Sequence, residues 1–572
     1  MPPEKRWEVT PPLPPEAEQE LQEYPEILRR LLYNRGCTTR QLAEEFLTAQ
    51  PPPGTQPENM LGIPAAVNRL AYALEHGESI AIYGDYDADG VTATALLVQF
   101  LRQLGANVQG YIPNRFDEGY GLNLTALNDL KEQGVQLVIT VDCGIRSPIE
   151  AEHARHIGLD LIITDHHHPL GLVPNALAVV NPKQPGDSYP DKDLAGVGLA
   201  YKMAVGLLNH LEKQNPLLCL PQPVEEYLDL VALGTISDIA PLKGENRALV
   251  KQGLEYIRQP RRQGVASLIG VAGLVAHNIG ATEISFALGP RLNAAGRIES
   301  ALAALHLLTT DKLYEAGELA QKLENQNRER QEITLKALER AVQLAQPERD
   351  GQFLLIAADP DFNPGIVGLV ASRLTEQYYR PSIIAHRGED FTRASCRSIP
   401  EFHITDALDE CADLMEHHGG HAAAAGFTIR NERWRELTER LQQIALRQLG
   451  ELDLRPVLRA DLELPLHAVK PEILNYIEYL QPTGNANPQP LFLTRGLKVV
   501  RFKPVGRDNA HLRLTLTDGR ITYDAIGFRQ GSWAENMPHF VDVMYFFEKN
   551  EYNGNQTLQL NLRDLKPADL SV

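Results

Sequence analysis

The chain has 572 residues, of which 43% are hydrophobic and 23% charged, so we expect roughly three or four packed domains and exclude a chain that is disordered throughout. Its formal net charge of −19 disfavours a dedicated nucleic-acid binder, so contacts with such a partner would depend on local basic patches. The sequence has no apolar run long enough for a membrane span, no N-terminal secretory signal and no CxxC pair among its five cysteines, which favours a cytoplasmic location.

The first half of the chain predicts an α/β domain behind a less regular N-terminal segment. Residues 1–60 are rich in Pro and Glu, with helical patches and a loop at 51–57. Within 61–310, short apolar runs alternate with helical patterns, which is typical of a parallel sheet covered by helices. The expected strands are 79–83, 108–113, 136–142, 159–167 and 176–182, and the expected helices are 92–105, 124–134 and 149–158.

The second half predicts three further parts. Residues 311–347 favour one connecting helix, because neither Gly nor Pro interrupts them between Gly317 and Pro347. A second α/β domain is expected over 348–450. Residues 451–572 alternate short β-like runs with turns, which predicts a small β-barrel.

Three of the predicted strands end in acidic and histidine residues. Because functional groups gather at the carboxyl ends of strands in open α/β sheets, we expect these residues to share one crevice. They are Asp85, Asp87 and Asp89 at the end of the first strand, Asp142 at the end of another, and Asp165, His166 and His167 at the end of a third.

This crowd of carboxylates predicts a site for two divalent cations, Mn²⁺ or Mg²⁺. Like charges so close together disfavour joint ionisation unless cations are bound, and two-metal sites of this kind hydrolyse phosphate esters. A Ca²⁺ loop of the EF-hand type is disfavoured, since the twelfth position counted from Asp85 is Leu96 instead of Glu. A capped turn would explain the Asp-His-His run alone, but not all three strand ends.

The motifs together resemble a known family. GDYDADG (84–90), VDCG (141–144), TDHHH (164–168) and LVALGTISDIAPL (230–242) resemble the DHH phosphoesterase superfamily, and GGHAAAAGF (419–427) is similar to its DHH-associated domain. Further segments are similar to those of the RecJ single-stranded-DNA exonucleases in the same order. They are NRGCTTRQLAEEFL (34–47), YIPNRFDEGYGL (111–122), DLAGVGLAYK (193–202), FALGPRLNAAGRIES (286–300), LENQNRERQ (323–331) and PTGNANPQPLF (482–492).

The resemblance implies a 5′→3′ exonuclease that releases 5′-mononucleotides from single-stranded DNA in recombination and repair. It implies an oligonucleotide-binding (OB) fold for the barrel, and a RecQ-type helicase and a single-strand-binding protein as partners. Metal ligands are implied at Asp87, Asp89, Asp142, His166 and Asp238. His167 resembles a substrate-facing catalytic histidine, while Asp85 and Asp165 are expected to be ligands or to orient the histidines.

Candidate substrate-binding residues lie outside the acidic motifs. Arg115 and Tyr120 flank a loop that could close on the strand end, or form an ordinary ion-paired surface loop. Arginine side chains and the backbone amides of a Gly-Gly pair can both bind phosphate oxygens. The alternatives are that Arg297 pairs with a carboxylate and that the Gly-Gly pair forms a purely structural turn. The other candidates are Arg291, Asn293, Arg297, Ser395, Arg397, Ser398 and His421.

The barrel offers weaker candidates for gripping the strand, because single aromatic residues are more often core than stacking platforms. They are Phe492, Arg495, Lys498, Arg501, Phe502 and Lys503.

The sequence departs from the family pattern at four positions, all outside the implied ligands. Phe362 and Asn363 stand where Trp and His are usual, Ala394 where Gly is frequent, and Ser237 where Ala is common. Two alternative functions follow from the same residues. A phosphodiesterase of short oligonucleotides or cyclic dinucleotides, or a pyrophosphatase, would need neither barrel nor long helix. A non-catalytic DNA-binding scaffold would not need every ligand position filled by Asp or His.

Overall fold

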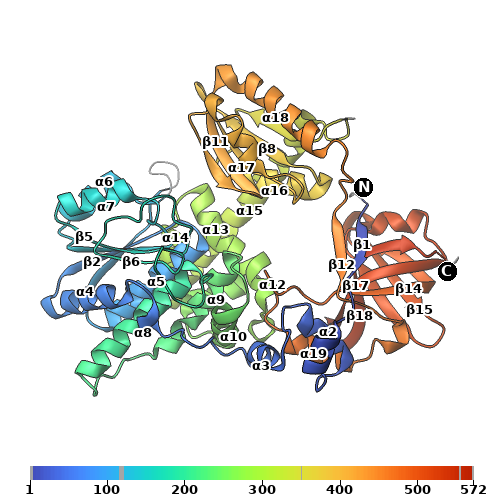
Figure 1. The fold of residues 1–572 in the computed structure, drawn as a ribbon, viewed down its shortest axis with the longest axis horizontal. Helices are drawn as coiled ribbons and strands as arrows, with labels where there is room; N and C mark the ends of the chain where they lie inside the picture. Colours follow the sequence, from blue (N-terminus) through green and yellow to red (C-terminus); the bar gives the residue numbers. More distant parts are fainter. Residues whose placement is uncertain (1–3, 115–120, 350, 553–554, 570–572) are drawn as a thin grey trace. The chain divides into compact units, whose positions relative to one another are not determined.

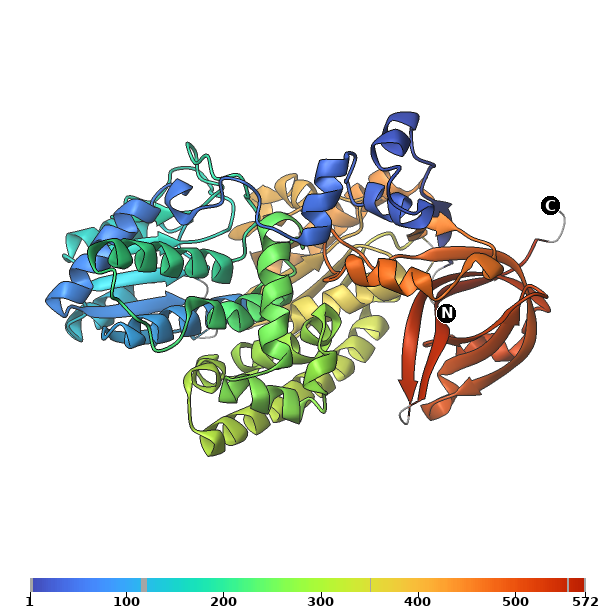
Figure 2. The same ribbon diagram turned by 90° about the horizontal axis from the view of Figure 1, so that it is seen from below.

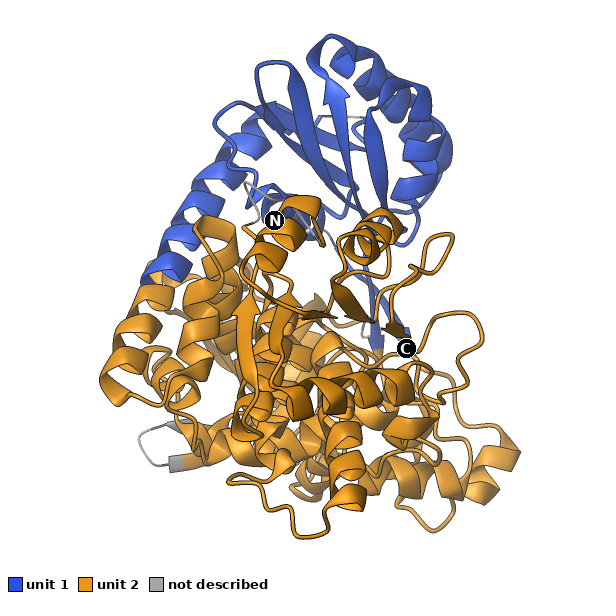
Figure 3. Ribbon diagram, turned by 90° about the vertical axis from the view of Figure 1, so that its left-hand side faces the viewer, with its two compact units in different colours: residues 1–8, 325–459 blue, residues 9–324, 460–572 orange. Residues whose placement is uncertain are grey.

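The computed structural model describes residues 4–114, 121–349, 351–552 and 555–569. The chain forms two compact units (Figure 3): residues 1–8 with 325–459, and residues 9–324 with 460–572. In the part of the chain that the structure describes, no helix combines the length and the apolar character of a membrane span.

The larger unit contains a five-stranded sheet in the order β3-β2-β4-β5-β6, and every pairing is parallel. This confirms the predicted parallel α/β architecture. All five residues of β4 are buried, as expected for a strand covered on both faces. The strands are β2 (Ser79–Gly84), β3 (Asn107–Tyr111), β4 (Leu137–Val141), β5 (Asp160–Thr164) and β6 (Ala178–Val180).

Helices cover both faces of this sheet (Figure 1). Ile80, Ile82 and Ile139 point to a core shared with α4, α5, α8 and α9, whereas the alternate residues Ala81 and Val138 pack under α6 and α7. Further helices extend the first core. The bounds are α4 (Ile63–His76), α5 (Ala88–Gln103), α6 (Leu124–Glu132), α7 (Pro148–His156), α8 (Gly196–Gln214), α9 (Leu228–Ser237), α10 (Gly244–Arg258), α11 (Gln263–Val271), α12 (Ala281–Glu283), α13 (Gly289–Ile298) and α14 (Leu302–Thr309).

A barrel completes the larger unit. Its order is β13-β14-β15-β16-β18-β17, and the additional pairing of β14 with β17 closes it, as predicted. The strands are β13 (Leu462–Glu463), β14 (Phe492–Val505), β15 (His511–Thr517), β16 (Thr522–Gly527), β17 (Phe540–Tyr552) and β18 (Asn555–Pro567), and the helix before them is α19 (Glu472–Tyr479).

The N-terminal helices lie beside the barrel (Figures 1 and 2). Leu21, Leu31 and Leu32 are fully buried in one hydrophobic cluster with Leu466 of the barrel region and Ile473 of α19. The N-terminal segment is therefore part of the barrel's core. Its helices are α1 (Pro15–Glu20), α2 (Glu26–Tyr33) and α3 (Arg40–Thr48).

The smaller unit has a mixed sheet in the order β10-β11-β9-β8-β7, in which only β7 and β8 are parallel. The long helix α15 (Leu313–Ala345) leads into it, close to the predicted range 311–347, and the strands β1 (Arg6–Val9) and β12 (Val457–Ala460) pair as a separate sheet. The other elements are β7 (Leu355–Asp359), α16 (Val367–Tyr378), β8 (Ser382–Arg387), β9 (Phe391–Arg397), α17 (Ile404–Asp409), β10 (His417–His421), β11 (Ala424–Arg430) and α18 (Trp434–Leu449).

Candidate metal centre and active site

The register of the parallel sheet brings three aspartates together. Gly84 of β2 pairs with Val141 of β4, and Val141 pairs with Thr164 of β5. The residues that follow these strand ends are Asp85, Asp142 and Asp165, and all three are buried, with at most 3% exposed. The predicted convergence of the strand-end motifs is therefore present in the structure.

The start of α5 adds two more carboxylates. Asp87 caps the helix by accepting the backbone amides of Asp89 at 2.9 Å and Gly90 at 3.1 Å. This cap starts the helix at Ala88, four residues before the predicted position.

Asp89 is held by a second helix. Its two carboxylate oxygens accept the amides of Gly196 at 2.7 Å and Val197 at 2.8 Å, at the start of α8. Free amides and the positive end of the helix dipole favour a carboxylate at this position. No local spacing rule could have predicted this contact, because more than 100 residues separate its partners in the chain.

Two glycines leave room for Asp89. A Cβ atom on Gly196 would lie 2.7 Å from Cβ of Asp142 and 3.0 Å from Oδ2 of Asp89. A Cβ atom on Gly234 of α9 would lie 2.9 Å from Oδ1 of Asp89. Close packing of α8 and α9 around the carboxylate thus requires glycine at both positions.

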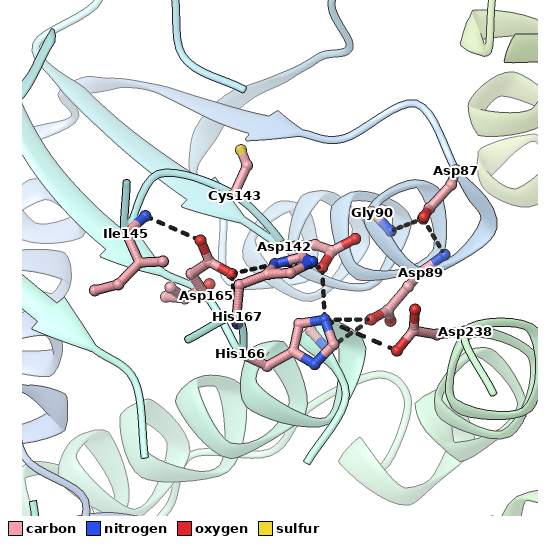
Figure 4. A network of polar contacts seen from close by, with 12 residues as sticks. Asp87, Asp89, Gly90, Asp142, Cys143, Ile145, Asp165, His166, His167 and Asp238 are labelled. Atoms are coloured by element: carbon pink, nitrogen blue, oxygen red, sulfur yellow. Dashed lines mark hydrogen bonds and ion pairs between the residues drawn. The ribbon is translucent and has the colours of Figure 1, made fainter. Parts of the chain in front are cut away.

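His166 points into this cluster (Figure 4). Its Nε2 atom lies 3.0 Å from Asp142, 3.8 Å from Asp238 and 3.9 Å from Asp89, measured to the nearest carboxylate oxygen. Asp238 arrives from the C-terminal end of α9, and only the family resemblance had indicated it. Three sets of ligand atoms lie within 4.8 Å of one another: Asp85, Asp87 and Asp142; Asp89, His166 and Asp238; and Asp142, His166 and His167.

The chemistry of this donor set fits divalent cations. Burial and the charge of Asp87 raise the pKa of Asp89 to about 7, and burial and the charge of Asp89 raise the pKa of Asp238 to about 9. Burial and the neighbouring carboxylates also raise the pKa of Asp142 well above its usual range. Burial lowers the pKa of His166 to about 3, which keeps the imidazole in the neutral form that ligates metals.

Asp165 and His167 form a hydrogen-bonded pair at the edge of the cluster, where Nδ1 of His167 also lies 3.9 Å from Asp142. Although burial alone would lower it, the hydrogen bond and charge of Asp165 raise the pKa of His167 above its usual value. Asp165 also accepts the amide of Ile145 at 2.9 Å, and its own pKa is lowered by His167 against the effect of burial. The His167 side chain is 35% exposed, so this ring is accessible from outside the cluster.

Three substrate-binding candidates lie on α13, and one of them, Asn293, contacts the start of α5. Asn293 accepts the backbone amide of Ala88 at 2.7 Å, so it fixes the start of α5. Arg291 lies 2.7 Å from Glu324 and donates to the backbone of Ala287. Arg297 is half-buried on the same helix. Two further candidates, Arg115 and Tyr120, lie outside the described residues.

In the smaller unit, Ser395 and Arg397 gather at the start of α16. Arg397 donates to Ser395 Oγ at 3.2 Å, and a Cβ atom on Gly368 would lie 3.1 Å from Ser395 Oγ. The Ser398 hydroxyl donates to the Phe402 carbonyl at 2.6 Å. His421 ends β10 and is exposed. Phosphate binding by Ser395, Arg397, Ser398 and His421 therefore stays a prediction.

The departures from the family pattern lie nearby. Phe362 is buried in a hydrophobic cluster that includes α16, and Asn363 accepts the amide of Gly365 at 2.7 Å. Ala394 is buried within β9. In the larger unit, Ser237 is the last residue of α9.

The barrel candidates separate into core and surface. Phe492 is 1% exposed, so its predicted role in stacking on a base is wrong, and the residue is part of the barrel core. Phe502 is 44% exposed and, with Arg501 and Lys503, lines a hollow of about 290 Å³. Arg495 pairs with Glu463 and Asp542, while Lys498 lies on β14 without burial.

The site and the architecture define a class of protein, the DHH phosphoesterases. Residues 79–235 match the family described as "DHH family, N-terminal domain", residues 350–447 the "DHHA1 domain", and residues 460–564 the "RecJ OB domain".

More specific similarity comes from whole chains. The single-stranded-DNA-specific exonuclease RecJ of Escherichia coli is 34% identical over 562 residues, which is 95% of this chain and 96% of the relative. RecJ of Bacillus subtilis is 38% identical over 94% of this chain and 67% of the relative. The chain belongs to the RecJ family of single-stranded-DNA-specific exonucleases.

Solved structures agree with this assignment. The structure of Thermus thermophilus RecJ with Mn²⁺ matches 99% of this chain and 80% of that one, with a TM-score of 0.84 and 32% identity. The same protein with Mg²⁺ matches with a TM-score of 0.78 and 30% identity. The predicted use of Mn²⁺ or Mg²⁺ thus agrees with the cations of these relatives and with the clustered acidic and histidine residues here.

Proposed function

We propose that this chain degrades single-stranded DNA from the 5′ end by metal-dependent hydrolysis and releases 5′-mononucleotides during recombination and repair. One observation carries the proposal: in a chain of the RecJ family, five aspartates and two histidines form three overlapping groups, and within each group the ligand atoms lie within 4.8 Å of one another. A scaffold without catalysis would not need this complete set of buried and half-buried carboxylate and imidazole ligands.

The proposed ligands divide into two groups. Asp85, Asp87 and Asp142 would hold one cation, and Asp89, His166 and Asp238 the other. When bound, such cations lower the pKa of a coordinated water and offset charge on a phosphate.

The chain's own residues supply orientation and binding. Asp165 fixes the ring of His167, whose exposed face we assign to contact with the scissile phosphate or the leaving oxygen. In the smaller unit, Ser395, Arg397, Ser398 and His421 would bind phosphates of the strand. In the barrel, Phe502 and the cations beside it would hold bases and phosphates. Arg291, Asn293 and Arg297, with Arg115 and Tyr120, remain proposed substrate contacts of the larger unit.

Location and partners belong to the same proposal. Four of the five cysteines are buried thiols, a state that supports a reducing compartment and hence a cytoplasmic location. A RecQ-type helicase and a single-strand-binding protein are the proposed partners, and the family resemblance supports them.

The test is degradation of end-labelled single-stranded DNA with Mn²⁺ or Mg²⁺, beside duplex of the same sequence. We expect immediate release of a 5′ label as mononucleotide, gradual shortening of a 3′-labelled strand, and survival of the duplex. Asp142→Ala should abolish cleavage, whereas Asp129→Ala, an exposed aspartate on α6 of the same domain, should not.

Other outcomes distinguish the alternatives. Binding of the strand without any cleavage would favour the scaffold. Cleavage restricted to dinucleotides or cyclic dinucleotides would favour the small-substrate phosphodiesterase. Immediate release of a 3′ label would reverse the proposed polarity while leaving the metal centre in place.

A further inference from the structure

The backbone directly after Asp238 is strained. Asp238 is the C-cap of α9, and Ile239 follows it with a φ of +61°, in the left-handed region. The Ile239 amide donates to Ile236 at 3.2 Å and the Ala240 amide to Thr235 at 3.1 Å, which is the Schellman arrangement that ends helices. Glycine is usual at the left-handed position, and a β-branched residue there is an outlier.

A loop before the barrel holds this strained segment. The side-chain amide of Asn485 donates to the Ile239 carbonyl at 2.7 Å, and the Leu242 amide donates to the Asn485 carbonyl at 2.9 Å. The Ile239 side chain is 68% exposed, so apolar packing supplies little to keep the residue in this conformation. Asn485 thus donates one hydrogen bond to Ile239 and accepts one from Leu242, so its two contacts hold both ends of the segment that follows Asp238.

The loop itself is fixed on its other side. Asn487 is fully buried and donates to the carbonyls of Leu480 and Pro482 at 2.8 and 2.7 Å. Arg247 of α10 donates to the same two carbonyls, and Arg35 of the N-terminal segment donates to the Asn487 side chain at 2.9 Å. These contacts anchor the loop that carries Asn485 to α10 and to the N-terminal segment.

We propose that Asn485 is a positioning residue for Asp238: it holds Ile239 in the left-handed conformation and so keeps the Asp238 carboxylate facing His166. The inference rests on the proposed metal centre. It makes the loop before the barrel part of the support of that centre, although no residue of the barrel reaches the ligands themselves among the described contacts.

The test is Mn²⁺ affinity of the full chain, measured by calorimetry on the parent, Asn485→Ala, Ile239→Gly and the double variant. Loss of an outer partner of a ligand weakens metal affinity by roughly 10- to 100-fold, so we expect about a tenfold higher Kd in Asn485→Ala for the site that contains Asp238. Glycine adopts the left-handed conformation without strain, so adding Ile239→Gly should restore the Kd to within about threefold of the parent.

Controls separate positioning from folding. Asn536→Ala removes an exposed asparagine of the barrel and should bind Mn²⁺ like the parent. If Asn485→Ala binds Mn²⁺ with the same Kd as the parent, the positioning role of Asn485 is wrong, while the proposed metal centre stands. Weak binding that Ile239→Gly does not restore would also overturn the positioning role, because Asn485 would then act through the fold in general. Absence of Mn²⁺ binding in the parent would overturn the proposed metal centre and this inference with it.

Discussion

The Oδ1 oxygen of Asp165 accepts both the Nδ1–H of His167, at 2.8 Å, and the backbone amide of the same residue, at 3.0 Å. Figure 4 shows the rings of His166 and His167 next to each other: Nε2 of His166 lies 3.0 Å from Asp142, whereas Nδ1 of His167 lies 2.8 Å from Asp165 and 3.9 Å from Asp142. Adjacent residues in the sequence therefore have different surroundings: one imidazole is buried among proposed ligands, and the other is oriented by a carboxylate and accessible.

Asp165→Asn should separate these roles. Both carboxylate oxygens of Asp165 accept N–H groups, so the NH₂ group of asparagine must face one of these donors. We expect cleavage to fall by roughly 10- to 100-fold, and the Mn²⁺ Kd to change by less than about threefold. Asp160→Asn, at the other end of β5, is the control, and equal losses of affinity and activity would make the pair part of the ligand set.

Gly196→Ala should damage the site through crowding. The added methyl would lie 2.7 Å from Cβ of Asp142, so α8 or the aspartates must shift. We expect a loss of about 1–3 kcal/mol in unfolding free energy and weaker Mn²⁺ binding, measured by denaturant titration and calorimetry. Gly270→Ala on α11 meets nothing within 4 Å and should stabilise by up to about 1 kcal/mol. Equal effects of the two substitutions would contradict the packing argument.

Metal removal should make stability fall with rising pH. In the metal-free protein the pKa values of Asp89 and Asp238 are raised to about 7 and about 9, above an ordinary value of 3.8. The folded state thus keeps protons that the unfolded state has lost, and this contribution to stability disappears as pH rises through that window. Thermal unfolding with chelator should show a lower Tm at pH 8 than at pH 6. Added Mn²⁺ should raise the Tm more at pH 8, and a pH-independent gain would refute the model of crowded carboxylates.

Lys202→Met should lower the free energy of unfolding, because it leaves a buried carboxylate outside the metal centre without its cation. Lys202 pairs with the fully buried Glu245, which also accepts the Tyr189 hydroxyl at 2.5 Å. Burial already raises the pKa of Glu245 despite Lys202, and the substitution should raise it further. We expect a loss of about 3–5 kcal/mol near neutral pH and a smaller loss as the pH falls and Glu245 takes up a proton. Lys322→Met, from the exposed pair with Glu299, should cost less than about 1 kcal/mol.

The sheet and its strand-end motifs could be predicted because buried parallel strands appear as continuous apolar runs. The carboxylates after β2, β4 and β5 converge simply because neighbouring parallel strands end at one edge. Asp238 gives no such signal, since it follows a helix, and its place depends on how α9 packs against α5 and α8. The amides of Gly196 and Val197 that hold Asp89, and the Asn485 contact, depend on tertiary packing in the same way.

The shared core of the N-terminal helices and the barrel was equally hidden from local patterns. Asn34, for example, donates to Asp461, 427 positions further along the chain. Composition and periodicity identify elements and their exposed faces, but they do not say which distant element covers an apolar face.

The shared core of the N-terminal helices and the barrel has a consequence for folding during synthesis and for the design of fragments. Helices α1 to α3 are synthesised more than 400 residues before the barrel strands that cover them, so they have no packing partner until those strands are made. A fragment cut near residue 451 would likewise lack Leu21, Leu31 and Leu32 from its interior. A stable recombinant barrel will need the N-terminal helices, either fused to it or supplied as a second polypeptide.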